Sequence, residues 1–147
     1  MPFVSVSDPR YSDVVLQEDE NLYSRARATA TITTATGTYK QGTVLFRTKS
    51  IDPTVAWDVV DAVGDISIAN EYAILIGDNF KPTEAITLTN AVARDVLTIK
   101  RFARLKESVL KDIYITGYSM SATDFNKLKH VLSLQGILVE DSLTAIA

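Results

Sequence analysis

The stretch Tyr72-Ala73-Ile74-Leu75-Ile76-Gly77 is the longest apolar run of the chain, and Glu71 and Asp78 bound it. A short apolar run without polar alternation is typical of a strand that is covered on both faces. We therefore expect residues 71–76 to form the centre of a β-sheet and of the core. The run is far shorter than the roughly 20 apolar residues of a transmembrane helix, so the sequence predicts no membrane span or membrane partner.

Strand and turn patterns surround this run. The predicted strands cover residues 43–48 and 55–60, the second with Trp57 near its middle, and the predicted turns lie at Gly37-Thr38 and Asp52-Pro53. Residues 83–93 fit either a short helix capped by Thr83 or a further strand, and propensity leaves both open. Polar and apolar side chains alternate imperfectly over residues 95–110, which favours one or two extended strands.

A single amphipathic helix is predicted near the end of the sequence. Ser121 or Thr123 can cap it, Asp124 suits its first turn, and Gly136 suits the position after its last residue. The residues expected on its buried face recur at helical spacing: Phe125, Leu128, Val131, Leu132 and Leu134. A final strand over residues 137–139 and a small tail over residues 142–147 are expected to follow.

The first part of the sequence divides into two segments. Residues 1–21 hold isolated apolar side chains and an acidic run without a sustained period, so they predict an extended arm before a β-rich domain over residues 22–147. Residues 25–34 alternate between a polar side, with Arg25, Arg27, Thr29 and Thr31, and a side of small apolar residues. Such a strand pairs either inside the domain as an edge strand or along the sheet of another chain, and both alternatives stay open.

Composition predicts one domain without cysteine chemistry. The chain has 147 residues, 46% of them hydrophobic, no cysteine and a net charge of -3. The charge is uneven, because residues 1–24 carry five carboxylates and one arginine while residues 94–111 carry six basic and two acidic side chains. This separation either steers a head-to-tail contact or reflects two solvated faces. No basic flank precedes an apolar stretch at the N-terminus, so no secretory signal is expected.

Catalytic and metal-binding patterns are lacking in the sequence. His130 is the only histidine and lies among helix-surface residues, so one chain cannot form a histidine triad or a multi-histidine metal site. The carboxylates Asp52, Asp58, Asp61 and Asp65 lack the spacing of a calcium loop and are interpreted as solvated turn residues. The six glycines are dispersed, so no phosphate loop is predicted. We expect no enzyme activity, no cofactor and no bound metal.

A basic segment with an interleaved aromatic residue spans residues 100–106. Lys100, Arg101, Phe102 and Arg104 superficially suit nucleic acid, but the sequence pI of about 5.1 disfavours a dedicated nucleic-acid binder. A contact with an acidic protein surface fits these residues as well.

The order of four segments resembles a known family. Gly42-Thr-Val-Leu, then Tyr72-Ala-Ile-Leu-Ile-Gly-Asp, then the strand region 96–110, and last the helix and strand over residues 125–139 are similar to the head-decoration (capsid cement) proteins of tailed bacteriophages, the lambda-like family. The resemblance covers residues 38–143. Two departures are Ala73, where the family often has glycine, and residues 111–120, which lack the usual tryptophan- or proline-containing connection.

The resemblance implies a fold, a partner and a location. The fold would be mainly β with one short C-terminal helix, a small β-tulip-like barrel with an extended N-terminal arm. The protein would stand as a homotrimer at three-fold sites of the expanded capsid, after assembly in the host cytoplasm, and would stabilise the shell against internal DNA pressure. Its arm would join a sheet of the major capsid protein.

Residue roles follow from the same resemblance. The arm and first strand would bind the capsid through Phe3, Val4, Val14, Val15, Leu16, Arg25, Arg27, Thr29 and Thr31. Lys100, Arg101, Phe102 and Arg104 would contact a subunit or the capsid. The alternative is a β-rich tail or fibre module that binds carbohydrate. It is disfavoured because the single tryptophan, Trp57, lies in an apolar strand instead of on an aromatic platform.

Overall fold

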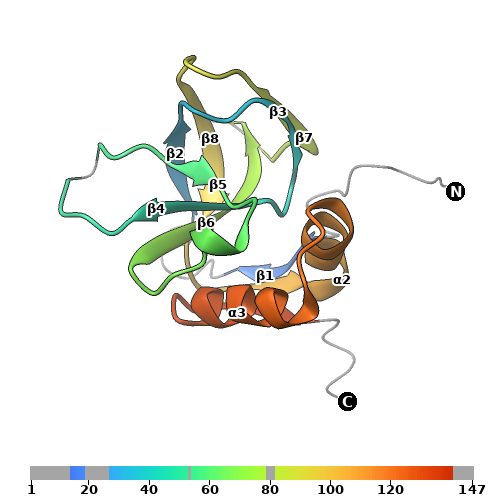
Figure 1. The fold of residues 1–147 in the computed structure, drawn as a ribbon. Helices are drawn as coiled ribbons and strands as arrows, with labels where there is room; N and C mark the ends of the chain where they lie inside the picture. Colours follow the sequence, from blue (N-terminus) through green and yellow to red (C-terminus); the bar gives the residue numbers. More distant parts are fainter. Residues whose placement is uncertain (1–13, 19–26, 53, 79–81, 141–147) are drawn as a thin grey trace, which may run out of the picture.

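The computed structural model describes residues 14–18, 27–52, 54–78 and 82–140. A five-stranded antiparallel sheet forms its centre, in the order β2 (Arg27–Ile32), β8 (Arg94–Ile99), β6 (Asn70–Asp78), β4 (Val44–Thr48) and β5 (Asp58–Val59). The sheet curls until its two edge strands meet, where the N–H of Trp57 donates to the C=O of Thr31 at 2.9 Å beside a bridge between Ile32 and Trp57. Figure 1 shows the resulting half-barrel.

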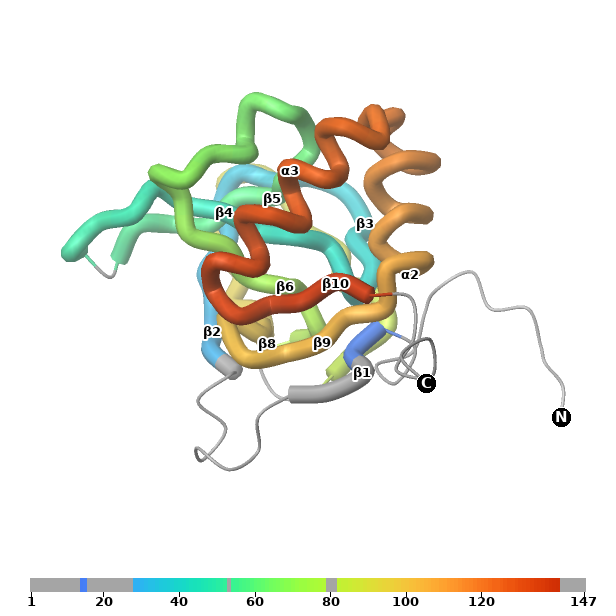
Figure 2. Tube along the Cα trace, turned by 90° about the horizontal axis from the view of Figure 1, so that it is seen from below, coloured from blue at the N-terminus to red at the C-terminus, as the bar shows by residue number. Residues whose placement is uncertain are grey.

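Two smaller sheets complete the fold. The pair β3 (Gly37–Lys40) and β7 (Ala85–Leu88) is antiparallel and packs Ile86 and Leu88 against the inner side of the curled sheet. The second consists of β1 (Val15–Glu18), β9 (Ala103–Lys106) and β10 (Ile137–Glu140), with β1 antiparallel and β10 parallel to β9. This three-stranded sheet lies on the outer side of the half-barrel together with the helices (Figure 1 and Figure 2).

The helical segments are short and mostly late in the chain. A single 3-10 turn, η1 (Val63–Asp65), precedes β6. After β9, the helix α2 (Glu107–Lys111) continues into a π-helical segment, η2 (Asp112–Gly117), and α3 (Ala122–Ser133) follows before β10. In the part of the chain that the structure describes, no helix combines the length and apolar character of a membrane span.

Strand β6 separates two hydrophobic cores. Tyr72, Ile74 and Ile76 pack into a first core between the five-stranded sheet, the helices and the three-stranded sheet. Ala73 and Leu75 point the other way into a second core inside the half-barrel, where Trp57 also lies. All five side chains are at most 1% exposed. The prediction that residues 71–76 form a strand covered on both faces is therefore confirmed.

The structure of α3 confirms most of the predictions made for this helix from the sequence. Ser121 is the capping residue, since its hydroxyl accepts from the N–H of Asp124 at 3.1 Å. Gly136 adopts a φ of 78°, as expected for a glycine that follows a helix. The buried residues are Phe125, Leu128, Val131 and Leu132. The prediction for Leu134 is wrong, because this residue lies just beyond the last helical residue and is 61% exposed.

Other expectations need correction. A mainly β fold is confirmed, but a single helix is wrong, because residues 107–117 are helical and bury Leu110 and Tyr114 in the first core. Gly37-Thr38 opens β3 instead of forming a turn, and β7 resolves residues 83–93 in favour of a strand. Of residues 55–60, only Asp58–Val59 form a strand, with Trp57 in an isolated bridge.

The division into an arm and a domain also changes. Val14 is 0% and Val15 is 7% exposed, and β1 pairs with β9 through Val15, Gln17 and Glu18. Residues 14–18 therefore pack with the domain, where Val14 and Val15 are core residues and not exposed arm residues, and their contact with a capsid stays a prediction. Phe3, Val4 and Arg25, and most of the predicted arm and the tail 142–147, lie outside the described residues.

Candidate interaction surface

The turn between β8 and β9 holds an exposed aromatic side chain in an unusual backbone conformation. Phe102 has a φ of 58° and is 47% exposed. Its ring lies against Gly136, where an added Cβ would come within 3.2 Å of the Phe102 Cδ1 atom. A positive φ is rare for a bulky residue. The glycine at the end of α3 therefore leaves room for the Phe102 ring at the surface.

A hollow of about 440 Å³ opens beside this turn. Its walls come from segments far apart in the sequence, namely the end of β4, the start of β6, the β8–β9 turn and the end of α3. Gln135 and Gly136 line it together with Glu71. We name the remaining lining residues the basic-apolar surface; they are Lys49, Lys100, Arg101, Phe102 and Leu134.

A charged cluster supports one side of the hollow. Glu71 Oε1 lies 3.3 Å from Arg47 Nη2 and 3.4 Å from Lys100 Nζ. Both cations also lie over the ring of Trp57, with Arg47 Cζ at 4.5 Å and Lys100 Nζ at 5.4 Å from its centroid. These contacts hold Lys100 in place. Among the described residues, Lys49 and Arg101 have no ion pair, so their charges are available to a partner.

Gln135 lines the hollow and makes three hydrogen bonds to the backbone. Its Oε1 accepts from the N–H of Tyr72 at 2.6 Å, and its Nε2 donates to the C=O groups of Tyr72 and Lys100, both at 2.7 Å. The side-chain amide thereby joins the turn after α3 to β6 and to the end of β8. A surface supported this way is held before any partner arrives, which reduces the entropic cost of binding.

The structure separates the other predicted contact residues from this surface. Arg104 lies on β9 and pairs with Glu140 of β10 at 3.0 Å. Thr29 and Thr31 lie on β2, which pairs with β8 inside the domain, and Thr31 donates to Asp95. In backbone register, Arg27 is opposite Ile99 and Leu16 belongs to β1; their side chains are outside the description. The internal edge-strand interpretation of residues 25–34 is confirmed for β2.

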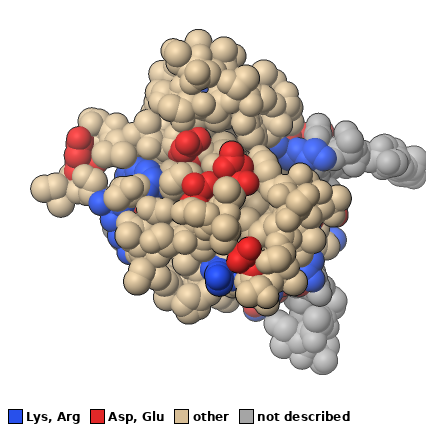
Figure 3. Space-filling model, viewed as in Figure 1, with Lys and Arg blue, Asp and Glu red and all other residues tan. Residues whose placement is uncertain are grey.

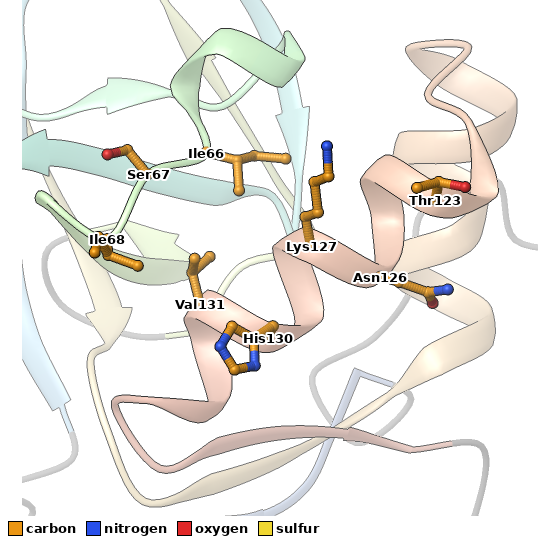
Figure 4. Close-up of a pocket in the computed structure, with 8 residues that line it drawn as sticks. All are labelled: Ile66, Ser67, Ile68, Thr123, Asn126, Lys127, His130 and Val131. Atoms are coloured by element: carbon orange, nitrogen blue, oxygen red, sulfur yellow. The ribbon is translucent and has the colours of Figure 1, made fainter.

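His130 lies in a second hollow, which has a volume of about 490 Å³. Figure 4 shows Ile66 and Ile68, from the segment before β6, facing Val131 and Lys127 of α3. His130 is exposed, as predicted for a helix-surface residue. Among the described residues that line this hollow there is no carboxylate beside the imidazole.

Carboxylates gather on another face, near β5 (Figure 3). The pKa of Asp61 is raised by burial, by a hydrogen bond with Asp65 and by the nearby charges of Asp65 and Asp58. Asp52 lies in an exposed turn and accepts from the N–H of Thr54 at 2.9 Å. Within the described ranges, no group of three or more histidine, aspartate or glutamate side chains could hold a metal ion.

Sequence reasoning found part of the basic-apolar surface and missed the rest. Lys100, Arg101 and Phe102 were predicted as contact residues, and Gly136 was identified as the residue that ends the helix. Lys49 and Leu134 were missed, because only the tertiary structure brings the end of β4 and the end of α3 to the β8–β9 turn. Comparisons of the chain with protein-family models, with curated proteins and with solved structures find no match.

Proposed function

We propose that this protein is a structural component of a tailed-phage virion, which binds the outside of the expanded capsid as a homotrimer and stabilises the shell. The observation that carries the proposal is that the four segments of the family resemblance pack into one core. Val44, Ile74, Leu105 and Phe125, one from each segment, all belong to the first core. The apolar positions of the resemblance are therefore core positions of one domain, which is what a single decoration domain requires.

The opening glycine of the resemblance also has a structural role. Gly42 adopts a φ of 98°, and an added Cβ would lie 3.3 Å from Ile113 Cδ1 and 3.3 Å from Val14 Cγ1. Glycine is the residue that adopts this backbone at low cost. The curled sheet with bridged edges supports a small β-tulip-like barrel as the finer description of the fold.

The surface chemistry supports a binding protein over an enzyme. Phe102, Leu134 and two unpaired cations suit contact with another protein. Trp57 is 3% exposed, so the single tryptophan offers no platform to a sugar ring, which argues against the carbohydrate-binding alternative.

Capsid binding tests the proposal directly. The purified full chain is mixed with expanded and with unexpanded shells of the major capsid protein from the same genome, and the shells are imaged by cryo-electron microscopy. We expect added density at the local three-fold positions of expanded shells only, and a higher temperature of shell disruption. Shells that bind no protein, or that bind it only at two-fold positions, would contradict the proposal.

A further inference from the structure

We propose that the basic-apolar surface docks an acidic peptide segment of a partner protein, one that carries a large apolar side chain close to its carboxylates. This inference goes beyond the proposed function and does not require it, because any partner with such a segment would satisfy it. It rests on the shape of the hollow, on the exposed apolar side chains and on the charges around them.

The apolar part of the surface consists of Phe102 and Leu134. They are 47% and 61% exposed and line the same hollow of about 440 Å³. Phe102 has a φ of 58°, which is unusual for a bulky residue, and its ring packs against Gly136. Strained positions that expose a large side chain cluster at binding sites. We expect an apolar side chain of the partner to contact both residues.

The charged part of the surface favours a negatively charged partner. Lys49 and Arg101 have no ion pair in the described part of the chain, and Lys100 shares Glu71 with Arg47. The described lining of the hollow therefore holds three cations and one carboxylate, and that carboxylate is already paired. Carboxylates of a docked segment would pair with the free cations and would align the apolar side chain of the segment with the hollow.

A peptide fits these observations better than a nucleic acid. The hollow is lined by three cations and one carboxylate, which suits the few carboxylates of a short segment better than the continuous charge of a phosphate backbone. Nucleic-acid grooves combine a longer basic track with several stacking aromatics. Among the described residues that line this hollow, Phe102 is the only aromatic one.

The binding experiment uses the purified full chain and short random peptides displayed on yeast. Selected peptides are expected to be enriched in Asp and Glu beside Leu, Ile or Phe. The most enriched peptide is then synthesised with a fluorescent label, and its affinity is measured by anisotropy at several salt concentrations. Trp57, the single tryptophan, reports on the site because Lys100 Nζ lies 5.4 Å from its ring centroid. We expect its emission to change on binding and the affinity to fall with added salt.

Two variants and one control locate the peptide. Lys49→Gln with Arg101→Gln removes the free cations, and Phe102→Asn removes the ring while keeping a residue that tolerates a positive φ. Each is expected to weaken binding about tenfold or more, as for central interface residues. Lys127→Gln, on the exposed face of α3 in the other hollow, is the matched control and should leave the affinity unchanged.

Three results would overturn the inference. They are selection without an acidic bias, equal affinity of the cation variant and the wild type, and equal affinity of the Phe102 variant and the wild type. Tighter binding of a single-stranded oligothymidylate than of the selected peptide would assign the surface to nucleic acid instead. Because the peptide experiment uses the isolated chain, its result can be interpreted even if the protein does not bind a capsid.

Discussion

Beyond Ile99, β8 no longer pairs with β6, and side chains supply the hydrogen bonds that the β6 backbone would otherwise make to a neighbouring strand. Ile74 is the last residue of β6 in this direction that pairs with β8, and the N–H and C=O of Tyr72 bond to the Gln135 amide. Tyr114 acts in the same way at β4, since its buried hydroxyl accepts from the N–H of Val44 at 2.7 Å. Buried backbone groups need such partners, because an unpaired one costs about 1–3 kcal/mol.

Gln135→Ala tests this role. We expect a loss of about 1–3 kcal/mol in the free energy of unfolding, since the N–H and C=O of Tyr72 would lose their partner. Urea denaturation gives the value. Asn126→Ala, on the exposed side of α3, is the control and should stay within about 0.5 kcal/mol of the wild type. A loss of less than about 0.5 kcal/mol for Gln135→Ala would mean that water takes the place of the side-chain amide as the hydrogen-bond partner of Tyr72.

The two faces of α3 predict opposite results for neighbouring residues. Leu128 is 0% exposed, and Leu128→Ala should cost about 2–5 kcal/mol through lost burial and a cavity. His130→Ala should change the free energy of unfolding by about 0.5 kcal/mol or less, because the side chain is exposed. Chemical denaturation of both variants compares them. Similar losses in both would contradict this description of the helix.

At the scale of elements, β1 is part of the sheet that closes the first core. It covers one edge of β9 while β10 covers the other, and Val14 and Val15 fill space beside Leu105 in the core. Interior burial of a valine side chain is worth about 1.5–3 kcal/mol.

Two truncations separate β1 from the residues before it. Deletion of residues 1–18 removes both valines and should lower the free energy of unfolding by about 3–6 kcal/mol, twice the value for one valine. Deletion of residues 1–13 keeps them and should cost far less. Guanidinium denaturation of both forms measures the difference. Equal stability of the two truncated forms would show that β1 contributes nothing.

An ion-pair network joins α2 to α3. Glu107 lies 2.6 Å from Lys129 Nζ and 3.1 Å from Lys111 Nζ. The hydrogen bond from Lys129, with a second from Lys111 and the charges of both, lowers the pKa of Glu107 below the ordinary value of a glutamate. A lowered pKa in the folded state stabilises the fold above the unfolded pKa, and this stability is lost as the pH falls through the folded pKa.

Glu107→Gln therefore has a pH-dependent effect. At pH 7 the variant should be less stable than the wild type by about 1 kcal/mol, a value typical of a partly exposed network. The difference should shrink as the pH falls through the lowered pKa of Glu107, where the wild-type carboxylate takes up a proton. Thermal unfolding at a series of pH values checks this. A difference that is constant from neutral to acid pH would exclude the ion pairs as its cause.

At the scale of the whole molecule, one strand couples two cores. Tyr72, Ile74 and Ile76 of β6 serve the first core, while Ala73 and Leu75 serve the second. Neither core can lose its packing without disturbing the strand that forms the wall of the other. The chain should therefore unfold in one cooperative transition.

Trp57 makes this coupling measurable. It lies in the second core, whereas Leu128 lies in the first. In Leu128→Ala, the denaturation midpoint from Trp57 fluorescence should move by the same amount as the midpoint from far-ultraviolet circular dichroism. A fluorescence transition that stays at the wild-type midpoint would show that the two cores unfold independently.

The sequence by itself determined the features that depend on neighbouring residues. The apolar run of β6, the cap at Ser121 and the glycine that ends α3 all follow from local backbone and side-chain chemistry. The alternation of a polar side and a side of small apolar residues agrees with β2, where Thr29 is exposed and Ala30 is 2% exposed. These rules act over a few residues, so one sequence suffices to apply them.

Only the tertiary structure decided the features that depend on distant partners. The isolated valines of β1 resemble arm residues in sequence, and only the pairing of β1 with β9 shows that they are buried. Leu110 and Tyr114 lie in helical segments whose buried side packs into the first core. The basic-apolar surface joins Lys49, Phe102 and Leu134, which no local pattern connects. Burial is a property of the assembled fold, and long-range pairing selects among conformations that local propensity leaves nearly equal in free energy.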